Sequence, residues 1–344
     1  MSREPTRVYL TFDVECAEER RGPRGTVPAM DYELRAWGSF SNQPEPLGVP
    51  LVMDILEREG LRGTFFVEAL GAAHFGKAGL ATICGAVRER GHDLQLHLHP
   101  VLERPLWVSE GREPAADDLG LYPEAEQRAF LERGIGWFEA CGVPRSSIVA
   151  FRAGNFGANN DTWKAMAACG LRVSSNQNLS FLNRSCHIKG HPHANDAFNT
   201  GQGVLEVPIT NMEENSGQPR LLQISAISFA EACWTLEEAH RLGFAAVTFV
   251  SHPFEYFFID DVVTRRARPN WPNVLRLRRL ARYLHENEDR FQVQTMNQLA
   301  QRPLSQFPMG GDPKVQRLPR GRRRLRYSRL LEQGVKRLLS RPFF

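Results

Sequence analysis

The sequence predicts an α/β protein built as a distorted, TIM-like (β/α) barrel of seven or eight parallel strands, followed by a basic C-terminal tail. Short apolar or aromatic runs alternate with helical patterns, as in strands that pair in parallel through helical crossovers. No Gly-x-Gly-x-x-Gly follows the first run, which argues against an open dinucleotide-binding sheet. Polar motifs end four of the runs, and the carboxyl ends of parallel barrel strands share one face. We therefore expect these motifs to meet at the barrel mouth.

The periodicity of the apolar residues places eight strands and six helices in the body of the chain. The strands are expected near residues 8–14, 62–67, 93–98, 147–152, 171–175, 203–208, 245–250 and 291–295. The helices are expected near residues 48–59, 78–90, 123–141, 159–169, 228–242 and 271–286. Three long connections, 16–46, 101–122 and 176–202, follow strands on the motif-bearing face. Trp37 and Trp107 lie in them, either as stacking platforms for sugar rings or as packing residues.

Composition bounds the class of protein. The chain has 344 residues, of which 42% are hydrophobic and 24% are charged, as is usual for a globular protein. No apolar run reaches the roughly 18 residues that a membrane-spanning helix needs. The first residues lack the apolar core of a secretory signal, so we expect a cytoplasmic location. The six cysteines are scattered without a Cys-x-x-Cys pair, which predicts reduced thiols.

Asp13 and Glu15 are two residues apart at the end of the first strand, so their side chains point to the same face. His97 and His99 repeat this spacing on the third strand. Neutral imidazoles with a carboxylate form a common zinc site that leaves a position open for water. Taken alone, Asp13 and Glu15 could be a carboxylate pair hydrogen-bonded to loop amides. Taken alone, each histidine could be hydrogen-bonded within the core. The two motifs together favour a metal.

His252 and Arg152 end two further strands. Pro253 prevents its strand from continuing, which puts the His252 imidazole at the barrel mouth. His252 could act as a general acid or be hydrogen-bonded in the barrel rim. Arg152 is a fixed cation that could orient and keep ionised a carboxylate such as Asp13, or form a structural salt bridge.

These motifs, taken in order, resemble those of the polysaccharide deacetylase (NodB-homology) family. The resemblance spans about residues 6–300 and rests on Thr11-Phe12-Asp13, on Gly63-Thr64-Phe65-Phe66-Val67, on Gly91-His92-Asp93 with His97, on the Arg152 segment, on Ser251-His252-Pro253 and on the closing strand Phe291–Met296. It implies a distorted barrel with a divalent metal, usually zinc, that hydrolyses N-acetyl or O-acetyl groups on carbohydrate.

The resemblance also implies roles for single residues. Asp13 matches the catalytic base, His97 the first histidine ligand, Arg152 the arginine that supports the base, and His252 the general acid. Three positions depart from the family pattern. Val14 replaces the metal-binding aspartate, so Glu15 would take its role. Val101 replaces the second histidine, so His99 would take its role. The family's Arg-x-Pro-Tyr is Arg152-Ala153-Gly154-Asn155 here.

We therefore predict a metal-dependent hydrolase that removes N-acetyl or other acyl groups from an aminosugar or glycan, including one carried on a lipid. The expected metal ligands are Glu15, His97, His99 and Asp13, with zinc or another divalent cation. Two alternatives remain open. One is a hydrolase of small non-peptide amides with the same fold, and the other is a glycan-binding protein without catalysis.

The last segment, residues 313–344, differs from the barrel, which is expected to occupy residues 1–312. It holds eleven lysines and arginines against one acid, Glu332. A helix over 326–341 would be amphipathic and basic, and the chain ends in Phe343-Phe344. This pattern is typical of a helix that binds an anionic membrane surface. A helix packed on the barrel and a nucleic-acid-binding arm are the alternatives. The segment holds only Tyr327 as a stacking aromatic before its end, so nucleic acid is not expected.

Overall fold

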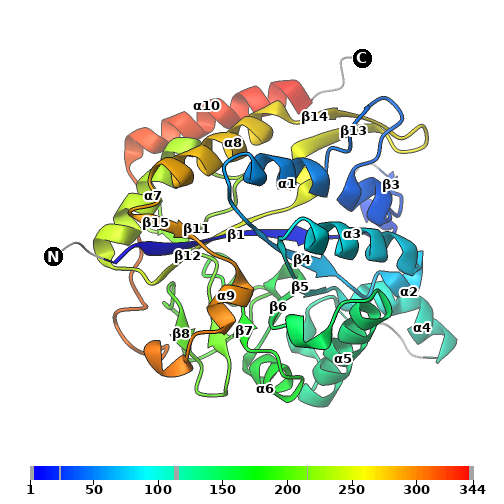
Figure 1. Ribbon diagram of the computed structural model, residues 1–344, viewed down its shortest axis with the longest axis horizontal. Coiled ribbons are helices and arrows are strands. Elements are labelled where there is room, and N and C mark those ends of the chain that lie inside the picture. The colour runs from blue at the N-terminus through cyan, green and yellow to red at the C-terminus, as the bar shows by residue number, and fades with distance from the viewer. Residues whose placement is uncertain (1–3, 23–24, 112–115, 215, 341–344) are drawn as a thin grey trace.

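The computed structural model describes residues 4–22, 25–111, 116–214 and 216–340, and within that part of the chain a nine-stranded sheet curls into a distorted barrel (Figure 1). The strand order is β12–β1–β4–β5–β6–β7–β9–β8, and β15 also pairs with β1. All neighbours are parallel except β8 and β9. The strands are β1 (Thr6–Val14), β4 (Thr64–Glu68), β5 (Asp93–Leu98), β6 (Ala150–Ala153), β7 (Val173–Ser174), β8 (Phe198–Asn199), β9 (Leu205–Glu206), β12 (Ala246–Ser251) and β15 (Phe291–Val293).

The two ends of the sheet are joined by irregular chain. Backbone bonds link Val250 of β12 to Leu222 and Ile224, at 3.0 and 2.9 Å. Those residues follow the hairpin of β10 (Asn211–Glu213) and β11 (Pro219–Leu221). The predicted barrel is therefore confirmed as a curled parallel sheet, with its last gap bridged by a loop segment.

The helices cover the outside of the sheet, as the apolar periodicity predicts. The six expected helices are α1 (Val49–Glu57), α3 (Lys77–Glu89), α5 (Glu124–Ala140), α6 (Asn160–Ala168), α7 (Phe229–Leu242) and α8 (Trp271–Glu286). Local signals fix their ends. Ser228 and Glu231 form a capping box at the start of α7, and Gly243 ends that helix in the left-handed conformation, with a φ of 76°.

Further short elements lie between these helices and strands. They are β2 (Arg20–Gly22), β3 (Gly25–Val27), η1 (Tyr32–Trp37), α2 (Ala72–Phe75), η2 (Pro100–Glu103), α4 (Arg104–Ser109), η3 (Leu119–Leu121), η4 (Arg145–Ser147), η5 (Gly154–Phe156), η6 (Pro253–Tyr256), β13 (Phe257–Asp261), β14 (Arg266–Pro269), α9 (Met296–Ala300) and η7 (Leu304–Gln306). The long helix α10 (Arg323–Ser340) follows all of them. Several belong to the long connections, which therefore form an ordered rim around the mouth.

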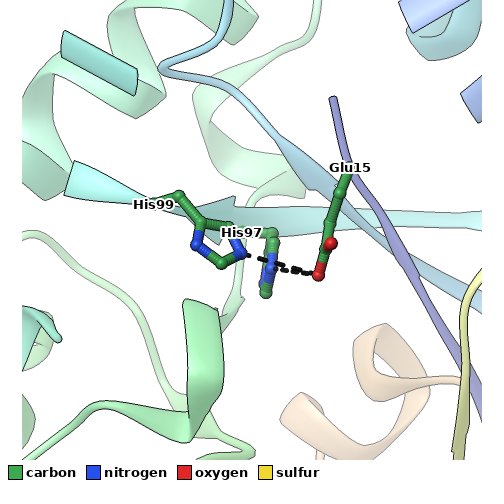
Figure 2. Close-up of side chains that lie close together, drawn as sticks. All are labelled: Glu15, His97 and His99. Atoms are coloured by element: carbon green, nitrogen blue, oxygen red, sulfur yellow. Dashed lines mark ion pairs between the residues drawn. The ribbon is translucent and has the colours of Figure 1, made fainter. Parts of the chain in front are cut away.

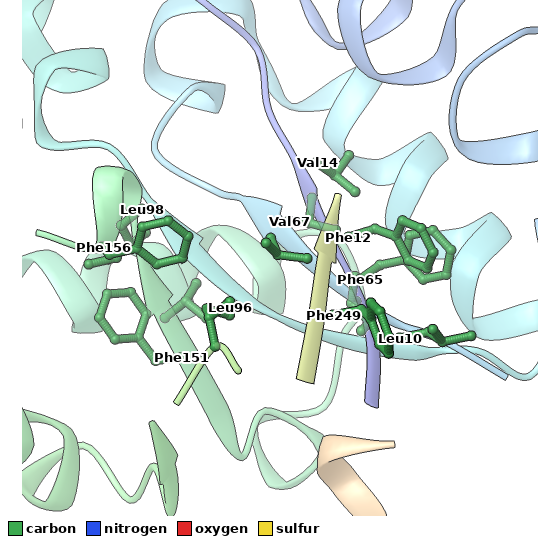
Figure 3. Packing of buried hydrophobic residues seen from close by; sticks show 14 of the residues in the cluster. Leu10, Phe12, Val14, Phe65, Val67, Leu96, Leu98, Phe151, Phe156 and Phe249 are labelled. Carbon is green, nitrogen blue, oxygen red and sulfur yellow. The ribbon is translucent and has the colours of Figure 1, made fainter. Parts of the chain in front are cut away.

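Side chains alternate between two sides of β1. Leu10, Phe12 and Val14 point outward into the layer between sheet and helices, where Phe12 stacks on Phe65 with ring centroids 5.2 Å apart (Figure 3). Tyr9 points inward and belongs to a second cluster that includes residues of α9. Because the period is two, Asp13 and Glu15 continue the inward row to the mouth.

The basic tail does not leave the barrel where its composition changes. Val315 is buried, and its carbonyl accepts a 2.7 Å hydrogen bond from the Asn195 amide. The Pro319 carbonyl similarly accepts from the Glu213 amide at 2.8 Å. Helix α10 then lies against α7 and α8 (Figure 1). Residues 341–344, including Phe343 and Phe344, lie outside the described residues.

Candidate metal centre and active site

Three imidazoles converge on one carboxylate oxygen at the barrel mouth. Glu15 Oε1 lies 3.4 Å from His97 Nε2, 3.5 Å from His99 Nε2 and 3.5 Å from His252 Nε2 (Figure 2, which draws the first two contacts). The residues come from the ends of β1, β5 and β12, which the parallel register brings to the same level of the sheet. The structure therefore brings these four side chains together at the barrel mouth, as the sequence predicts.

The ring nitrogens in this cluster fit a metal. Both nitrogens of His97 and Nε2 of His99 are buried without a hydrogen-bond partner among the described residues. Such buried orphans are costly unless a cation or water satisfies them. Donor atoms of Glu15, His97 and His99 lie within 4.8 Å of one another, and so do those of Asp13, Glu15 and His252. A set of imidazoles and carboxylates is the donor chemistry that zinc accepts.

Asp13 is held by Arg152. The Arg152 Nη1 donates a 2.5 Å hydrogen bond to Asp13 Oδ1, and both side chains are buried. Arg152 is fixed in turn, because its Nε donates to the Ser175 carbonyl at 3.1 Å and its guanidinium lies over the Phe66 ring. A guanidinium anchored in this way presents Asp13 to the mouth in one orientation.

His252 is supported by Glu255, which the sequence analysis did not single out. Glu255 Oε1 lies 3.5 Å from His252 Nδ1, and Glu255 Oε2 accepts from the His252 amide at 3.1 Å. Ser251 and Ser225 also donate to this carboxylate, each at 2.6 Å. The pattern His252-Pro253-Phe254-Glu255 is a capping box with proline at the first position of η6, so a local sequence signal for Glu255 existed.

Two more partners, Arg35 and Asp117, come from the long connections. Arg35 Nη2 donates to Glu15 Oε2 at 3.2 Å, and its guanidinium lies 3.6 Å from the Phe254 ring centroid. Asp117 Oδ2 lies 2.6 Å from His99 Nδ1. Neither residue belongs to a regular pattern, so nothing in the sequence marked them.

The charges around the cluster shift the pKa values of its members. Burial alone would raise the pKa of Glu15, but the surrounding imidazoles hold it well below its usual value. Burial would lower the pKa of His252, but the neighbouring carboxylates, first Glu15 and then Glu255, raise it to about 9. Burial would likewise lower the pKa of His99, and Asp117 raises it well above its usual value. Opposite charges within a few ångströms dominate here.

The cluster lines a cleft of about 460 Å³. Asp13, Glu15, His99 and His252 are on its wall, and so are polar and aromatic residues from the connections: Glu18, Arg20, Arg35, Asp117, Asn155, Phe156 and Phe181. Neither expected tryptophan lines it. Trp107 is buried and stacks on Phe130 at 5.5 Å, and Trp37 packs against the core, so both are packing residues.

Comparisons with known proteins place the fold. No protein-family model matches the chain, and no curated protein matches its sequence. A solved structure from Mycobacterium smegmatis, assigned as a polysaccharide deacetylase, superposes with a TM-score of 0.54 at 19% identity and covers 90% of this chain and 94% of that one. A 4-alpha-glucanotransferase from Thermococcus litoralis gives a TM-score of 0.49 at 12% identity, over 87% of this chain and 41% of that one.

A chitin deacetylase from the fungal pathogen Colletotrichum lindemuthianum gives a TM-score of 0.41 at 12% identity, over 90% of this chain and 93% of that one. The likeness to the Mycobacterium smegmatis protein establishes the architecture. This chain therefore shares the fold of that protein and is a distorted barrel, as its motifs predict.

Proposed function

We propose that this protein is a metal-dependent hydrolase that removes N-acetyl or other acyl groups from an aminosugar or glycan. The observation that carries the proposal is the convergence of three imidazole nitrogens on Glu15 Oε1, within 3.5 Å, beside Asp13 in an open cleft. Glu15, His97, His99 and Asp13 would hold zinc or another divalent cation. When bound, such a cation polarises an acyl carbonyl and lowers the pKa of a coordinated water.

Asp13 is proposed as the general base. It lines the cleft, and Arg152 bonds one of its carboxylate oxygens. That bond fixes the orientation of the carboxylate, which can then accept a proton from water in the cleft. Arg152 is therefore a positioning residue for this step.

His252 is proposed as the general acid. An amide is cleaved only if its departing nitrogen receives a proton, because an unprotonated amine is a poor leaving group. Burial lowers the His252 pKa, but the carboxylates of Glu15 and Glu255 raise it above its usual value, which favours the protonated imidazole that this step requires. His252 and Asp13 line the same cleft, and ligand atoms of the two residues lie within 4.8 Å of each other, so both could reach one acyl group.

The substrate class is proposed from the fold and the cleft. The fold is shared with a protein assigned as a polysaccharide deacetylase, and the aromatic residues Phe156 and Phe181 line the cleft. Sugar rings pack well on such faces. We also propose a cytoplasmic enzyme whose 313–344 tail keeps it at the inner face of a membrane, where lipid-linked aminosugars would be within reach.

The test is acetate release from N-acetylated glucosamine oligomers by the protein loaded with one equivalent of zinc. Asp13→Asn should lower turnover at least about 100-fold, because it removes the base without changing its size. Glu18→Gln is the matched control, since it makes the same change elsewhere on the cleft wall and should leave turnover unchanged.

Other outcomes would overturn the proposal in distinct ways. Cleavage of cyclic ureides but not of acetylated aminosugars would identify a small-amide hydrolase. A protein that binds glycan, takes up no stoichiometric zinc and releases no acetate would be a non-catalytic binder. Zinc uptake that survives His97→Ala combined with His99→Ala would place the metal elsewhere.

A further inference from the structure

Helix α10 contacts the barrel through its polar and charged side. Arg329 is buried, with Nη1 2.6 Å from Glu214 Oε1. Glu332 Oε2 accepts hydrogen bonds from Arg276 of α8 at 2.6 and 3.0 Å. A surface helix normally turns its apolar stripe to the core and its charges to water. The orientation of α10 is the reverse, so its apolar stripe is largely exposed.

The outward stripe of α10 is continuous. Tyr327, Leu331, Val335 and Leu338 follow one another at helical spacings of three and four, which places them on one side. Leu331 and Leu338 are 73% and 68% exposed, and Leu330 beside them is 50% exposed. Contiguous exposed apolar side chains of this size mark an interaction surface.

Helix α8 extends this stripe from the barrel side. Trp271 and Leu275 are both about half exposed. Together with Phe229, Leu331 and Val335 they line a shallow groove of about 380 Å³ between α8 and α10. The apolar surface therefore belongs to two helices, one from the barrel and one from the tail. We call it the α8–α10 face.

The α8–α10 face is bordered by cations. Arg323, Arg324, Arg326 and Arg337 of α10 are exposed, and so is Arg279 of α8. The only acid of α10 is Glu332, which is directed inward and bonded to Arg276. The exposed side of α10 thus combines leucines with arginines and carries no negative charge.

From this arrangement we propose that the α8–α10 face docks on the surface of an anionic lipid bilayer, with α10 lying in the plane of the headgroups. Aliphatic side chains beside arginines suit the boundary between acyl chains and phosphates. A symmetric contact between two copies would bring the arginine clusters together. Binding of nucleic acid to this face would leave the exposed leucines in contact with phosphate groups and water, which is unfavourable for apolar side chains. No helix that the structure describes is long and apolar enough to cross a membrane.

The position of α10 relates the docking face to the cleft. In Figure 1, α10 runs along one edge of the molecule outside α7 and α8, and its carboxyl end lies on the same side as the β13–β14 hairpin that follows His252. A bilayer along that edge would leave the barrel mouth opening beside the membrane. The docking face deepens the membrane location given under the proposed function, and it does not depend on the hydrolase activity; only the choice of a lipid-linked substrate does.

Flotation of the full-length protein with vesicles tests the proposal. We expect it to float with phosphatidylcholine vesicles that contain a quarter phosphatidylglycerol and to remain below with pure phosphatidylcholine. Leu331→Glu combined with Leu338→Glu should lower vesicle binding at least about tenfold, since it places charges in the apolar stripe. Arg323→Gln combined with Arg324→Gln and Arg326→Gln should weaken binding and its dependence on salt.

Point variants are preferred to removal of the tail, because Val315 is buried and residues 313–321 are bonded to the barrel. Leu121→Glu is the matched control, as Leu121 is 56% exposed in η3.

The proposal is overturned if the leucine variant floats like the unchanged protein, or if the unchanged protein does not bind anionic vesicles. A dimer that the leucine variant dissociates, with no vesicle binding, would assign the face to a second copy. Zinc-dependent acetate release from a soluble substrate should be the same in all variants, which separates this test from that of the proposed function.

Discussion

Asp117 Oδ2 lies 2.6 Å from His99 Nδ1, so the imidazole is held by one nitrogen while the other faces Glu15. The same arrangement recurs around the cluster. Arg35 holds Glu15, Arg152 holds Asp13 and Glu255 supports His252. Each group proposed to bind metal or move a proton, His97 excepted, thus has one charged partner outside the reaction, a common way of fixing the orientation of metal ligands.

The first prediction concerns Asp117. Asp117→Asn keeps the size of the side chain but removes the charge that orients His99 and raises its pKa. We expect zinc affinity to fall about 10- to 100-fold. Competition with a chromophoric chelator measures this affinity without any substrate. Asp118→Asn, one residue along the same loop, is the control and should leave the affinity unchanged.

The second prediction concerns pH and Glu255. The general acid must be protonated, and the Glu255 carboxylate helps to raise the pKa of His252. Glu255→Gln removes that charge, so the His252 pKa should fall and the alkaline limb of the kcat profile should move to lower pH. The measurement is kcat from pH 6 to 10 for both proteins. An alkaline limb that stays in place would remove His252 as the acid, or Glu255 as its support.

The third prediction concerns the buried pair of Arg152 and Asp13. Arg152→Met would leave the Asp13 charge buried without its partner, at a cost of about 3–5 kcal/mol in the free energy of unfolding. Adding Asp13→Asn removes the uncompensated charge and should recover a large part of this loss. Denaturant unfolding of the two single variants and the double variant measures the coupling. Strict additivity of the two changes would contradict a direct interaction.

The fourth prediction concerns His92, away from the cluster. His92 Nδ1 accepts from the Gly63 amide at 3.1 Å, and burial lowers the His92 pKa from 6.5 to about 4. The unfolded chain therefore takes up a proton first, and stability is lost as the pH falls from about 6.5 toward 4. The loss is on the order of 3 kcal/mol.

The variant His92→Asn tests this dependence, because its Oδ1 can still accept from Gly63 but does not titrate. It should be less stable than the unchanged protein at pH 7.5, through lost packing on Phe65. Its unfolding free energy should fall less between pH 7.5 and 4.5. Equal slopes for the two proteins would show that another group causes the acid dependence.

The expected positions of the strands and helices agree with the structure because both follow from local periodicity. The run that ends in Asp13 can bury its apolar face only as a strand, and the capping box of Ser228 and Glu231 fixes the start of α7. The short segments in the long connections were not anticipated. Arg35 and Asp117 lie there, and their positions depend on how each connection packs across the mouth.

In the tail, too, the sequence predicts the helix but not how the helix packs. Its sequence predicts an amphipathic basic helix, which α10 is, but a helical pattern does not say which side meets the barrel. The buried contacts of Arg329 with Glu214 and Glu231 decide that, and these acids lie about a hundred residues earlier in the chain. As a result, the leucines point outward.

The sequence by itself determined the parallel barrel and the row of Asp13, Glu15, His97 and His99, since local periodicity sets each strand and the alternation of strands with helices indicates parallel pairing. Only the tertiary structure decided which charged group holds each of these side chains and which side of α10 is exposed. Those choices are made between segments far apart in sequence, where the energy comes from burial and charge pairing that no local pattern encodes.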